Sequence, residues 1–286
     1  MSDYIKKVAV IGGGTMGRGI AVTCVQSGFE VILIDTNQSV VADAKTWAFA
    51  TWDMLSKKNK ITESQVKSFE QNLTFSSQLV DAKADIIIEA IVEKLTIKQE
   101  VLKQIAAIND KNCIIVSNTS SLSITAIASA MPRPENVAGL HFFNPAPIMK
   151  LVELVKGEKT NHETLLILEY LIKKLNKSFV ITKDAPGFIV NRVARHFYLE
   201  SLKIAEEQGA SIESIDALME SVGFKMGPFK LMDLIGNDIN YSVTKSLFDA
   251  FHYDSKFRPS RLQEQKVLSN QLGCKSGEGF YVYPKE

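Results

Sequence analysis

Four side chains suited to proton transfer and polar binding lie within one short stretch of the chain, residues 118–153. Ser120 contributes a hydroxyl, His141 an imidazole, Asn144 an amide and Glu153 a carboxylate. A histidine titrates near neutral pH, so it can take a proton from a substrate and return it. A neighbouring carboxylate fixes the tautomer of such a histidine and stabilises its imidazolium form. The stretch is therefore a candidate acid/base site.

Two of these residues, Ser120 and His141, come just after predicted strands. The apolar runs at residues 113–117 and 136–140 predict two consecutive strands, and the carboxyl ends of parallel strands share one edge of a sheet. An isolated histidine among apolar residues is usually structural. A position at this edge, beside a cofactor motif, favours a functional role instead.

A third predicted strand, residues 150–155, carries Glu153. Its alternating pattern places Glu153 on the face opposite Leu154. The ordinary interpretation is a surface glutamate on an edge strand. If Glu153 instead faces His141, it would orient the imidazole.

The element that would place a cofactor beside these residues is a glycine-rich turn near the start of the chain. The β-branched run at residues 5–11 predicts a strand, and it leads into Gly12, Gly14 and Gly17, which have the spacing G-x-G-x-x-G. Gly12 allows the tight turn, Gly14 lets the main chain approach a pyrophosphate, and Gly17 lets the following helix pack on the strand. An ordinary glycine-rich turn is the alternative.

The residues that follow complete a dinucleotide-binding unit. A helix is predicted after the glycines, from Gly19 to about Gly28, and its free N–H groups and positive dipole end favour phosphates. Thr15 and Met16, inside the glycine loop, are further candidates for cofactor binding. A second strand, Glu30 to Ile34, then leads to Asp35, whose carboxylate can accept hydrogen bonds from the ribose hydroxyls of an adenosine. A 2′-phosphate at this place would be repelled by the carboxylate of Asp35, so the pattern favours NAD over NADP. Adenine or flavin nucleotides are the alternative ligands.

Charged residues near these elements also have ordinary explanations. The apolar run at residues 84–90 predicts a strand buried on both faces, and Glu93 and Lys98 follow at its carboxyl end, where open α/β sheets bind ligands. Taken alone, both residues would be surface charges. The lysines of the SKKNK segment, Lys57 and Lys60, are typical of a solvated helix end unless a phosphate-bearing substrate is implied.

The composition is that of an ordinary soluble globular protein. The chain has 286 residues, 45% of them hydrophobic and 23% charged, and a formal net charge of +1, which gives no argument for binding nucleic acid or an anionic membrane. The three cysteines are widely spaced and suggest neither disulfides nor a metal site. A first strand at residue 5 and the lack of an apolar run of about 18 residues lead us to expect a cytoplasmic protein without a leader or membrane span.

The pattern changes character near residues 184–187, where Asp-Ala-Pro-Gly separates alternating strands and helices from almost purely helical sequence. We therefore expect two domains, residues 1–184 and residues 185–286. The fold class expected is α/β: a Rossmann-like, mostly parallel sheet in the first domain and an all-α second domain.

Several motifs together resemble those of bacterial 3-hydroxybutyryl-CoA and L-3-hydroxyacyl-CoA dehydrogenases. The matching segments run nearly from end to end and include IGGGTMGRGIA, IEAIVEKLTIKQ, SNTSSLSIT, GLHFFNPAPIMKLVELV, DAPGFIVNR, MGPFKLMDLIG and KSGEGFY. HFFNP together with PGFIVNR is highly specific, whereas the glycine loop alone is not.

The resemblance implies roles for the catalytic residues. His141 would be the general base that removes the 3-hydroxyl proton while hydride leaves for NAD, and Glu153 would orient it. Ser120 and Asn191 would hold the hydroxyl or keto oxygen and the thioester carbonyl of the substrate.

The resemblance also implies binding residues. Besides the glycine loop and Asp35, the expected NAD contacts are Glu93, Lys98, Asn144 and Lys275. Lys57 and Lys60 become candidates for the phosphates of coenzyme A. The partner expected besides the acyl-CoA substrate is a second copy of the chain, bound through the helical domain.

Some positions leave the substrate open. The residues before Met226 are Gly223-Phe224-Lys225, where many butyryl-type members have a His-Pro pair, and NRVAR and FRPS are more similar to dehydrogenases of hydroxyadipyl-CoA. A non-catalytic NAD-binding protein would be expected to lack His141 or Glu153, and neither is lost. Dehydrogenases of the 6-phosphogluconate or hydroxyisobutyrate type use a lysine base, which HFFNP argues against.

Overall fold

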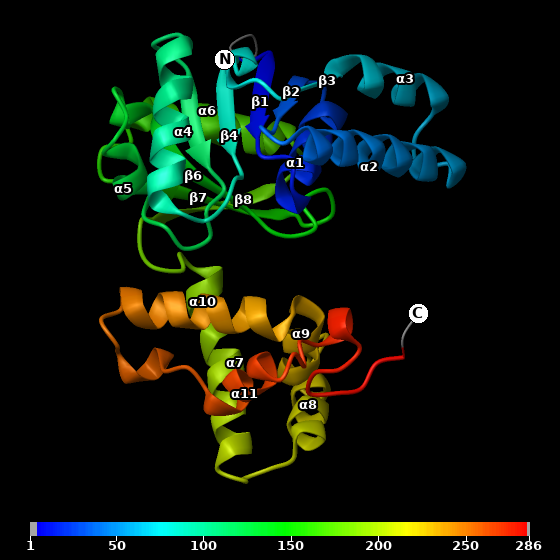
Figure 1. Cartoon of the computed structure of the whole chain (residues 1–286), viewed down its shortest axis with the longest axis vertical. Helices are drawn as coiled ribbons and strands as arrows, with labels where there is room; N and C mark the ends of the chain where they lie inside the picture. Colours follow the sequence, from blue (N-terminus) through cyan, green and yellow to red (C-terminus); the bar gives the residue numbers. More distant parts are fainter. Residues whose placement is uncertain (1–4, 285–286) are drawn as a thin grey trace. The chain divides into compact units, whose positions relative to one another are not determined.

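A computed structural model of the chain describes residues 5–284, which form two compact units (Figure 1). The first unit ends at Ala185 and the second begins at Pro186. Each unit has its own core.

The first unit is built on an eight-stranded sheet with the order β3-β2-β1-β4-β5-β6-β7-β8. All neighbouring strands are parallel except β6 and β7, which are antiparallel. The prediction of a Rossmann-like, mostly parallel sheet is confirmed. The strands are β1 (Lys7–Ile11), β2 (Glu30–Ile34), β3 (Leu73–Ser76), β4 (Ile86–Glu89), β5 (Ile114–Ser117), β6 (Val137–Phe142), β7 (Leu151–Lys156) and β8 (Ser178–Lys183).

The strand order reverses between β1 and β4. In open sheets of this kind ligands bind at such a reversal, outside the carboxyl ends of the strands. Helices cover both faces of the sheet, so the central strands are mostly apolar, and every residue of β4 and β5 is buried. The glycine turn follows β1 at this edge of the sheet.

One expected strand boundary is wrong. Residues 136–140 were predicted as a strand with His141 after its end, but β6 continues to Phe142 and contains His141. The cause is the antiparallel partner, because Phe142 still pairs with Val152 of β7. The first strand also begins at Lys7 and not at Ile5.

Helices pack on the sheet of the first unit. Side chains of α1, α2 and α6, among them Ile20, Trp52 and Leu168, share one core with alternate residues of the strands. On the other face of β6, a side chain at Gly139 would lie 2.8 Å from Ile124 of α5. The helices of this unit are α1 (Thr15–Gln26), α2 (Gln38–Lys57), α3 (Glu63–Asn72), α4 (Leu95–Ile108), α5 (Ile124–Ala128) and α6 (His162–Lys174), with short 3₁₀ turns at Leu79–Asp81 and Pro134–Asn136.

The second unit is helical, as predicted. Its core includes Tyr198, Leu202, Phe229 and Met232. The helices are α7 (Val190–Glu206), α8 (Ile212–Ser221), α9 (Pro228–Ile235), α10 (Asn237–Ala250) and α11 (Arg261–Leu268), with 3₁₀ turns at Ser255–Phe257 and Cys274–Ser276. The buried carboxylate of Asp233 accepts the N–H groups of Phe280 and Tyr281, each at 2.9 Å, and so holds the segment after the last turn.

Among residues 5–284, no helix combines the length and the apolar character that crossing a bilayer requires.

Candidate active site

The glycine turn has the geometry that a close-approaching ligand needs. Gly12 has a φ of 106°, and a Cβ there would lie 2.5 Å from the carbonyl oxygen of Ala90. A Cβ at Gly17 would lie 1.7 Å from the carbonyl oxygen of Gly12, so only glycine lets α1 pack this closely. At Gly14, by contrast, a Cβ would meet nothing within 4 Å. Nothing in the fold therefore requires glycine at position 14, and the open space is what a phosphate cradle leaves.

The start of α1 is available to an anion. Gly14 is the N-cap residue, and no side chain caps the helix there. The first residues of α1, Thr15 and Met16, are exposed and half-buried, respectively. Uncapped N–H groups and the positive end of the helix dipole together favour a phosphate.

Asp35 follows β2 and connects its own turn to the glycine turn. Its Oδ2 accepts the N–H of Gly13 at 2.9 Å, and its Oδ1 accepts the N–H of Asn37 at 2.9 Å. A hollow of about 450 Å³ lies beside it, with Gly14, Val92 and Ile97 among its lining residues. Apolar walls beside one carboxylate suit an aromatic base attached to a ribose.

A buried ionic cluster occupies the carboxyl end of β4. Lys98 is 1% exposed, and its Nζ lies 2.6 Å from Oε1 of Glu89 and 3.1 Å from Oε2 of Glu93. The interpretation of Lys98 as a surface charge is therefore wrong. Two carboxylates compensate the buried cation, which would otherwise be costly.

Glu93 connects this cluster to the loop that carries Ser120. Its Oε1 accepts the N–H of Ser120 at 3.1 Å and the hydroxyl of Ser121 at 3.1 Å, and the hydroxyl of Thr119 also bonds to it. Burial by itself raises the pKa of Glu93, but the charge of Lys98 and these hydrogen bonds outweigh it, so that the pKa lies below its ordinary value. Glu93 is therefore held as an anion that fixes the Ser120 loop.

His141 and Glu153 form a buried pair. They are partners in the register of β6 and β7, and His141 Nδ1 lies 2.7 Å from Glu153 Oε2. His141 is 6% exposed and Glu153 0% exposed. The interpretation of Glu153 as a surface residue is wrong, because β8 covers β7 and removes it from the edge of the sheet.

The Ser120 loop reaches the strand of His141. Oδ1 of Asn118 accepts the N–H of Phe142, the residue after His141, at 2.8 Å. Downstream, Asn144 is exposed and precedes Pro145 in a cis peptide bond. The structure thus connects Glu93, Lys98 and Ser120 in one network and brings that network to the end of β6.

The remaining predicted residues belong to other elements of the chain. Lys57 ends α2, where it pairs with Asp53 at 2.7 Å, and Lys60 is exposed three residues later. In the second unit, Asn191 is half-buried near the start of α7. Lys275, also in the second unit, pairs with Asp238 at 2.6 Å.

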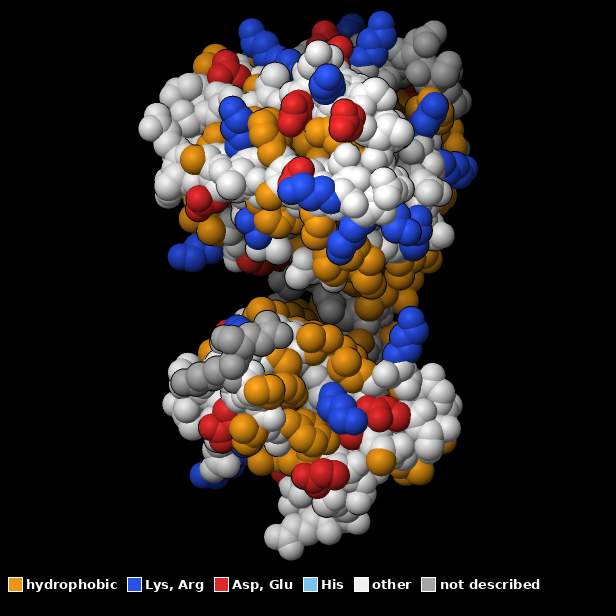
Figure 2. All heavy atoms as spheres, turned by 90° about the vertical axis from the view of Figure 1, so that its right-hand side faces the viewer, with side chains coloured by type: hydrophobic (Ala, Val, Ile, Leu, Met, Phe, Trp, Pro, Cys, Tyr) orange, Lys and Arg blue, Asp and Glu red, His pale blue; other side chains and the backbone are white. Residues whose placement is uncertain are grey.

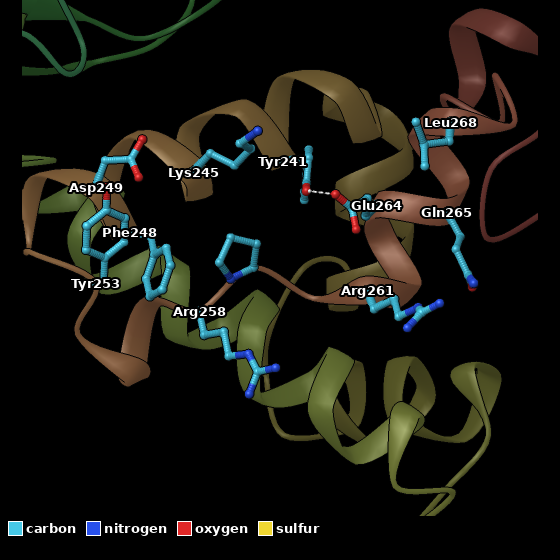
Figure 3. A pocket seen from close by; sticks show the side chains of 11 residues that line it. Tyr241, Lys245, Phe248, Asp249, Tyr253, Arg258, Arg261, Glu264, Gln265 and Leu268 are labelled. Carbon is cyan, nitrogen blue, oxygen red and sulfur yellow. Dashed lines mark hydrogen bonds between the residues drawn. The ribbon is translucent and has the colours of Figure 1, made fainter.

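The second unit has a hollow of its own, of about 660 Å³, between α10 and α11 (Figure 3). Its lining mixes aromatic and charged side chains, including Tyr241, Arg258 and Glu264. The Tyr241 hydroxyl donates to Glu264 at 2.6 Å, and burial and this contact raise the pKa of Tyr241 to about 12. None of the predicted site residues lines this hollow.

Two residues of the cluster were missed from the sequence. Glu89 looked like one more member of an apolar strand, and Ser117 like its counterpart in β5, yet Oε2 of Glu89 accepts the hydroxyl of Ser117 at 2.5 Å. A usable signal was present, because a carboxylate inside a strand buried on both faces must have partners.

Comparison with known proteins finds matches for both units. A family model described as "3-hydroxyacyl-CoA dehydrogenase, NAD binding domain" matches residues 7–185. A second, described as "3-hydroxyacyl-CoA dehydrogenase, C-terminal domain", matches residues 187–283.

Individual relatives match over the same range. The chain is 42% identical over 288 residues to "3-hydroxyadipyl-CoA dehydrogenase" of Escherichia coli; the match covers 100% of this chain but only 61% of that protein's length. It is 40% identical over 292 residues to "Hydroxyacyl-coenzyme A dehydrogenase, mitochondrial" of Sus scrofa, covering 98% of this chain and 91% of the relative. The crystal structure of (S)-3-hydroxybutyryl-CoA dehydrogenase from Ralstonia eutropha superposes with a TM-score of 0.94 at 39% identity, covering 98% of this chain and 100% of that chain.

Proposed function

Since the chain belongs to the 3-hydroxyacyl-CoA dehydrogenase family, we propose that it catalyses the reversible reaction (S)-3-hydroxyacyl-CoA + NAD⁺ ⇌ 3-oxoacyl-CoA + NADH + H⁺. The observation that carries this proposal is the buried contact of 2.7 Å between His141 and Glu153. This pair belongs to the same sheet as β1 and β2, the strands that lead into the glycine turn and Asp35.

The first unit is the NAD-binding domain of this family, and its residues fit that cofactor. Gly14 and the uncapped start of α1 would hold the pyrophosphate, and Asp35 would accept the adenosine ribose hydroxyls beside the apolar hollow. Bound NAD supplies a hydride acceptor for C3 of the substrate. Glu93, Asn144 and Lys275 remain proposed contacts to the rest of NAD, and the burial of Lys98 favours an indirect role through Glu93.

His141 is the general base of the proposed mechanism. When hydride leaves C3, positive charge develops on that carbon, and removal of the hydroxyl proton offsets it by forming the ketone. With Nδ1–H donating to Glu153, Nε2 is the basic atom that takes this proton, and the carboxylate stabilises the resulting imidazolium. In the reverse direction the same imidazolium returns the proton to the oxygen.

Two further side chains hold the substrate in this proposal. Ser120, whose backbone Glu93 fixes, would bind the hydroxyl or keto oxygen. Asn191 would hold the thioester carbonyl, and Lys57 and Lys60 would contact the phosphates of coenzyme A.

The acyl group is proposed to be short. The Ralstonia eutropha relative is named for 3-hydroxybutyryl-CoA, and the Escherichia coli relative for 3-hydroxyadipyl-CoA, whose acyl chain ends in a carboxylate. We take 3-hydroxybutyryl-CoA as the first candidate and 3-hydroxyadipyl-CoA as the second. A non-catalytic NAD-binding role is the weaker alternative, because the paired His141 and Glu153 would have no purpose in it.

We also propose that two copies associate through the second unit. Exposed apolar side chains of this unit gather around α8 and α9, and Figure 2 shows hydrophobic side chains on its surface. They include Leu218, Val222, Phe224, Leu234 and Ile235. Light scattering at micromolar concentration should give twice the mass of one chain, and a single-chain mass would contradict this.

The function is tested by NADH oxidation with acetoacetyl-CoA, followed by absorbance. Rates over 3-oxoacyl-CoA thioesters of increasing length, together with 3-oxoadipyl-CoA, then rank the acyl groups. The proposal predicts turnover with acetoacetyl-CoA or 3-oxoadipyl-CoA and a preference for NADH over NADPH. Tight NADH binding without turnover of any thioester would support the non-catalytic alternative instead.

A further inference from the structure

Glu89 is a fully buried carboxylate that no step of the proposed reaction uses. It is the last residue of β4 and is 0% exposed. In the sheet register it lies between Ile11 of β1 and Ser117 of β5, at the point where the strand order reverses. Because burying a carboxylate costs free energy unless it is paired, a charge at the centre of this edge calls for an explanation.

Three donors from three elements satisfy this carboxylate. Oε1 of Glu89 accepts Nζ of Lys98 at 2.6 Å and the N–H of Ile91 at 2.7 Å. Oε2 accepts the hydroxyl of Ser117 at 2.5 Å. One side chain thereby connects α4, the loop after β4 and the end of β5.

Two paths lead from these donors to the loop that carries the proposed substrate-binding serine. In the first, Nζ of Lys98 lies 3.1 Å from Oε2 of Glu93, and Oε1 of Glu93 accepts the N–H of Ser120 at 3.1 Å. In the second, the hydroxyl of Ser117 accepts the N–H of Thr119 at 3.3 Å. The carboxylate of Glu89 is thus connected to the Ser120 loop by two routes, one through Lys98 and Glu93 and one through Ser117.

The cluster also carries a net charge. Two carboxylates, Glu89 and Glu93, share one cation, Lys98, so the ionised cluster has one negative charge in excess. If a dinucleotide binds with its adenosine ribose at Asp35, beside β2, its other half would extend across the strand reversal, toward the carboxyl ends of β4 and β5. The oxidised nicotinamide ring is positively charged and the reduced ring is neutral, so a nearby net negative charge favours the oxidised form.

We propose that Glu89 is a positioning residue, which through Lys98 and Ser117 fixes Glu93 and the Ser120 loop, and whose charge biases the site toward the oxidised cofactor. This inference rests on the proposed function, since it places the nicotinamide half of NAD beside Glu93.

The charge is tested by Glu89→Gln. The amide oxygen can still accept Lys98 and the N–H of Ile91, so the shape of the site is kept while one negative charge is removed. The matched control is Asp85→Asn, at the residue just before the start of β4, where Asp85 accepts hydrogen bonds from the N–H groups of Lys6 and Lys7 at 2.8 and 2.9 Å. This control removes the same charge on the opposite edge of the sheet.

The measurement is the dissociation constant of the full chain for NAD⁺ and for NADH, by calorimetry and without any acyl-CoA. For Glu89→Gln we expect the ratio of the NAD⁺ constant to the NADH constant to rise on the order of fivefold. For Asp85→Asn we expect the wild-type ratio. An unchanged ratio in folded Glu89→Gln, or an equal rise in both variants, would overturn the charge bias.

The positioning role is tested by Ser117→Ala, which removes one hydrogen bond and no charge. We expect the NAD⁺/NADH ratio to stay at the wild-type value while kcat with acetoacetyl-CoA falls about tenfold, because the Ser120 loop is held from one side only. A wild-type kcat in Ser117→Ala would overturn the positioning role. This test does not depend on whether Glu89→Gln folds. If the wild-type chain turns over no acyl-CoA, the proposed function fails, whereas the binding ratio still decides the charge bias.

Discussion

His141 Nδ1 and Glu153 Oε2 lie 2.7 Å apart across the antiparallel pair β6–β7, where the two residues are direct partners in the register. The carboxylate therefore orients the imidazole through a contact that the backbone hydrogen bonds of a sheet determine. Neither residue depends on a mobile loop for this contact. Such rigid placement is what a proton-transferring group requires.

Removal of either partner should lower turnover strongly without abolishing cofactor binding. For His141→Ala and Glu153→Gln we expect kcat with acetoacetyl-CoA to fall by about 10² to 10⁴, since the base is lost in one and its orienting charge in the other. The dissociation constant for NADH, measured by fluorescence, should change less than about threefold. Full activity in either variant contradicts the assignment of the pair.

Two variants of the glycine turn should distinguish a residue needed for cofactor binding from a residue needed for stability. Gly14→Ala adds a methyl group into open space, so we expect an unchanged melting temperature and NADH affinity weakened at least about tenfold, because the methyl group fills the phosphate cradle. Gly17→Ala places a methyl group against the carbonyl oxygen of Gly12, so we expect a lower melting temperature by several degrees, on the order of 5 °C. Calorimetry of both variants checks this. If Gly14→Ala binds NADH as the wild type does, the pyrophosphate does not lie at Gly14.

The lysines at the end of α2 should contribute only for substrates that carry phosphates. In the double variant Lys57→Ala, Lys60→Ala we expect KM for acetoacetyl-CoA to rise about tenfold, as for the loss of charge-assisted contacts. KM for the acetoacetyl thioester of N-acetylcysteamine, which has no phosphate, should not change.

A matched control for the lysines exists at the end of α6, where Lys173 and Lys174 form a similar exposed pair. Replacing both with alanine should leave the two KM values as they are. Equal KM increases in the two double variants would point to general surface charge and not to a phosphate site.

Acid should weaken the clamp that Glu93 forms on the Ser120 loop. Because the pKa of Glu93 is lower in the folded chain than in the unfolded chain, ionised Glu93 stabilises the fold at neutral pH, and this contribution is lost as pH falls through the folded-state pKa. We therefore expect Glu93→Gln to melt below the wild type near neutral pH, and the difference to shrink as the pH is lowered into the acid range.

The matched control for Glu93→Gln is Glu100→Gln, at an exposed position of α4, the helix that follows Glu93. That variant should melt close to the wild type across the series. If the melting temperature of Glu93→Gln lies below that of the wild type by the same amount at every pH, the lost contacts are not those of an ionised carboxylate.

Local patterns were sufficient for most of the fold. The strand Glu30–Ile34 has the predicted limits, since its β-branched residues are bounded by Gly28 and by Asp35, and the glycine spacing marks the turn after β1. The helical second unit follows from its periodicity. These features depend on residues close together in the chain, where propensity and spacing act directly.

The rest depended on contacts between distant segments. Lys98 has the sequence environment of a surface lysine, and it is buried only because Glu89 and Glu93 approach it. β6 continues through His141 because β7 pairs with it, which the pattern of residues 136–140 does not contain. Burial of Glu153 likewise requires β8 on the far side of β7.

Because His141 and Glu153 are opposite one another in an antiparallel pair, the chain tolerates changes of length very differently on either side of the hairpin turn. Residues added or removed within 143–150 alter the connection but leave the pairing of the strands intact. A single residue gained or lost inside β6 or β7 turns every later side chain of that strand to the opposite face. The distance between the proposed base and its partner would then not grow gradually, and the carboxylate would point into the packed core on the other side of the sheet. Among natural variants of this chain, length differences should therefore be absent from the two strands.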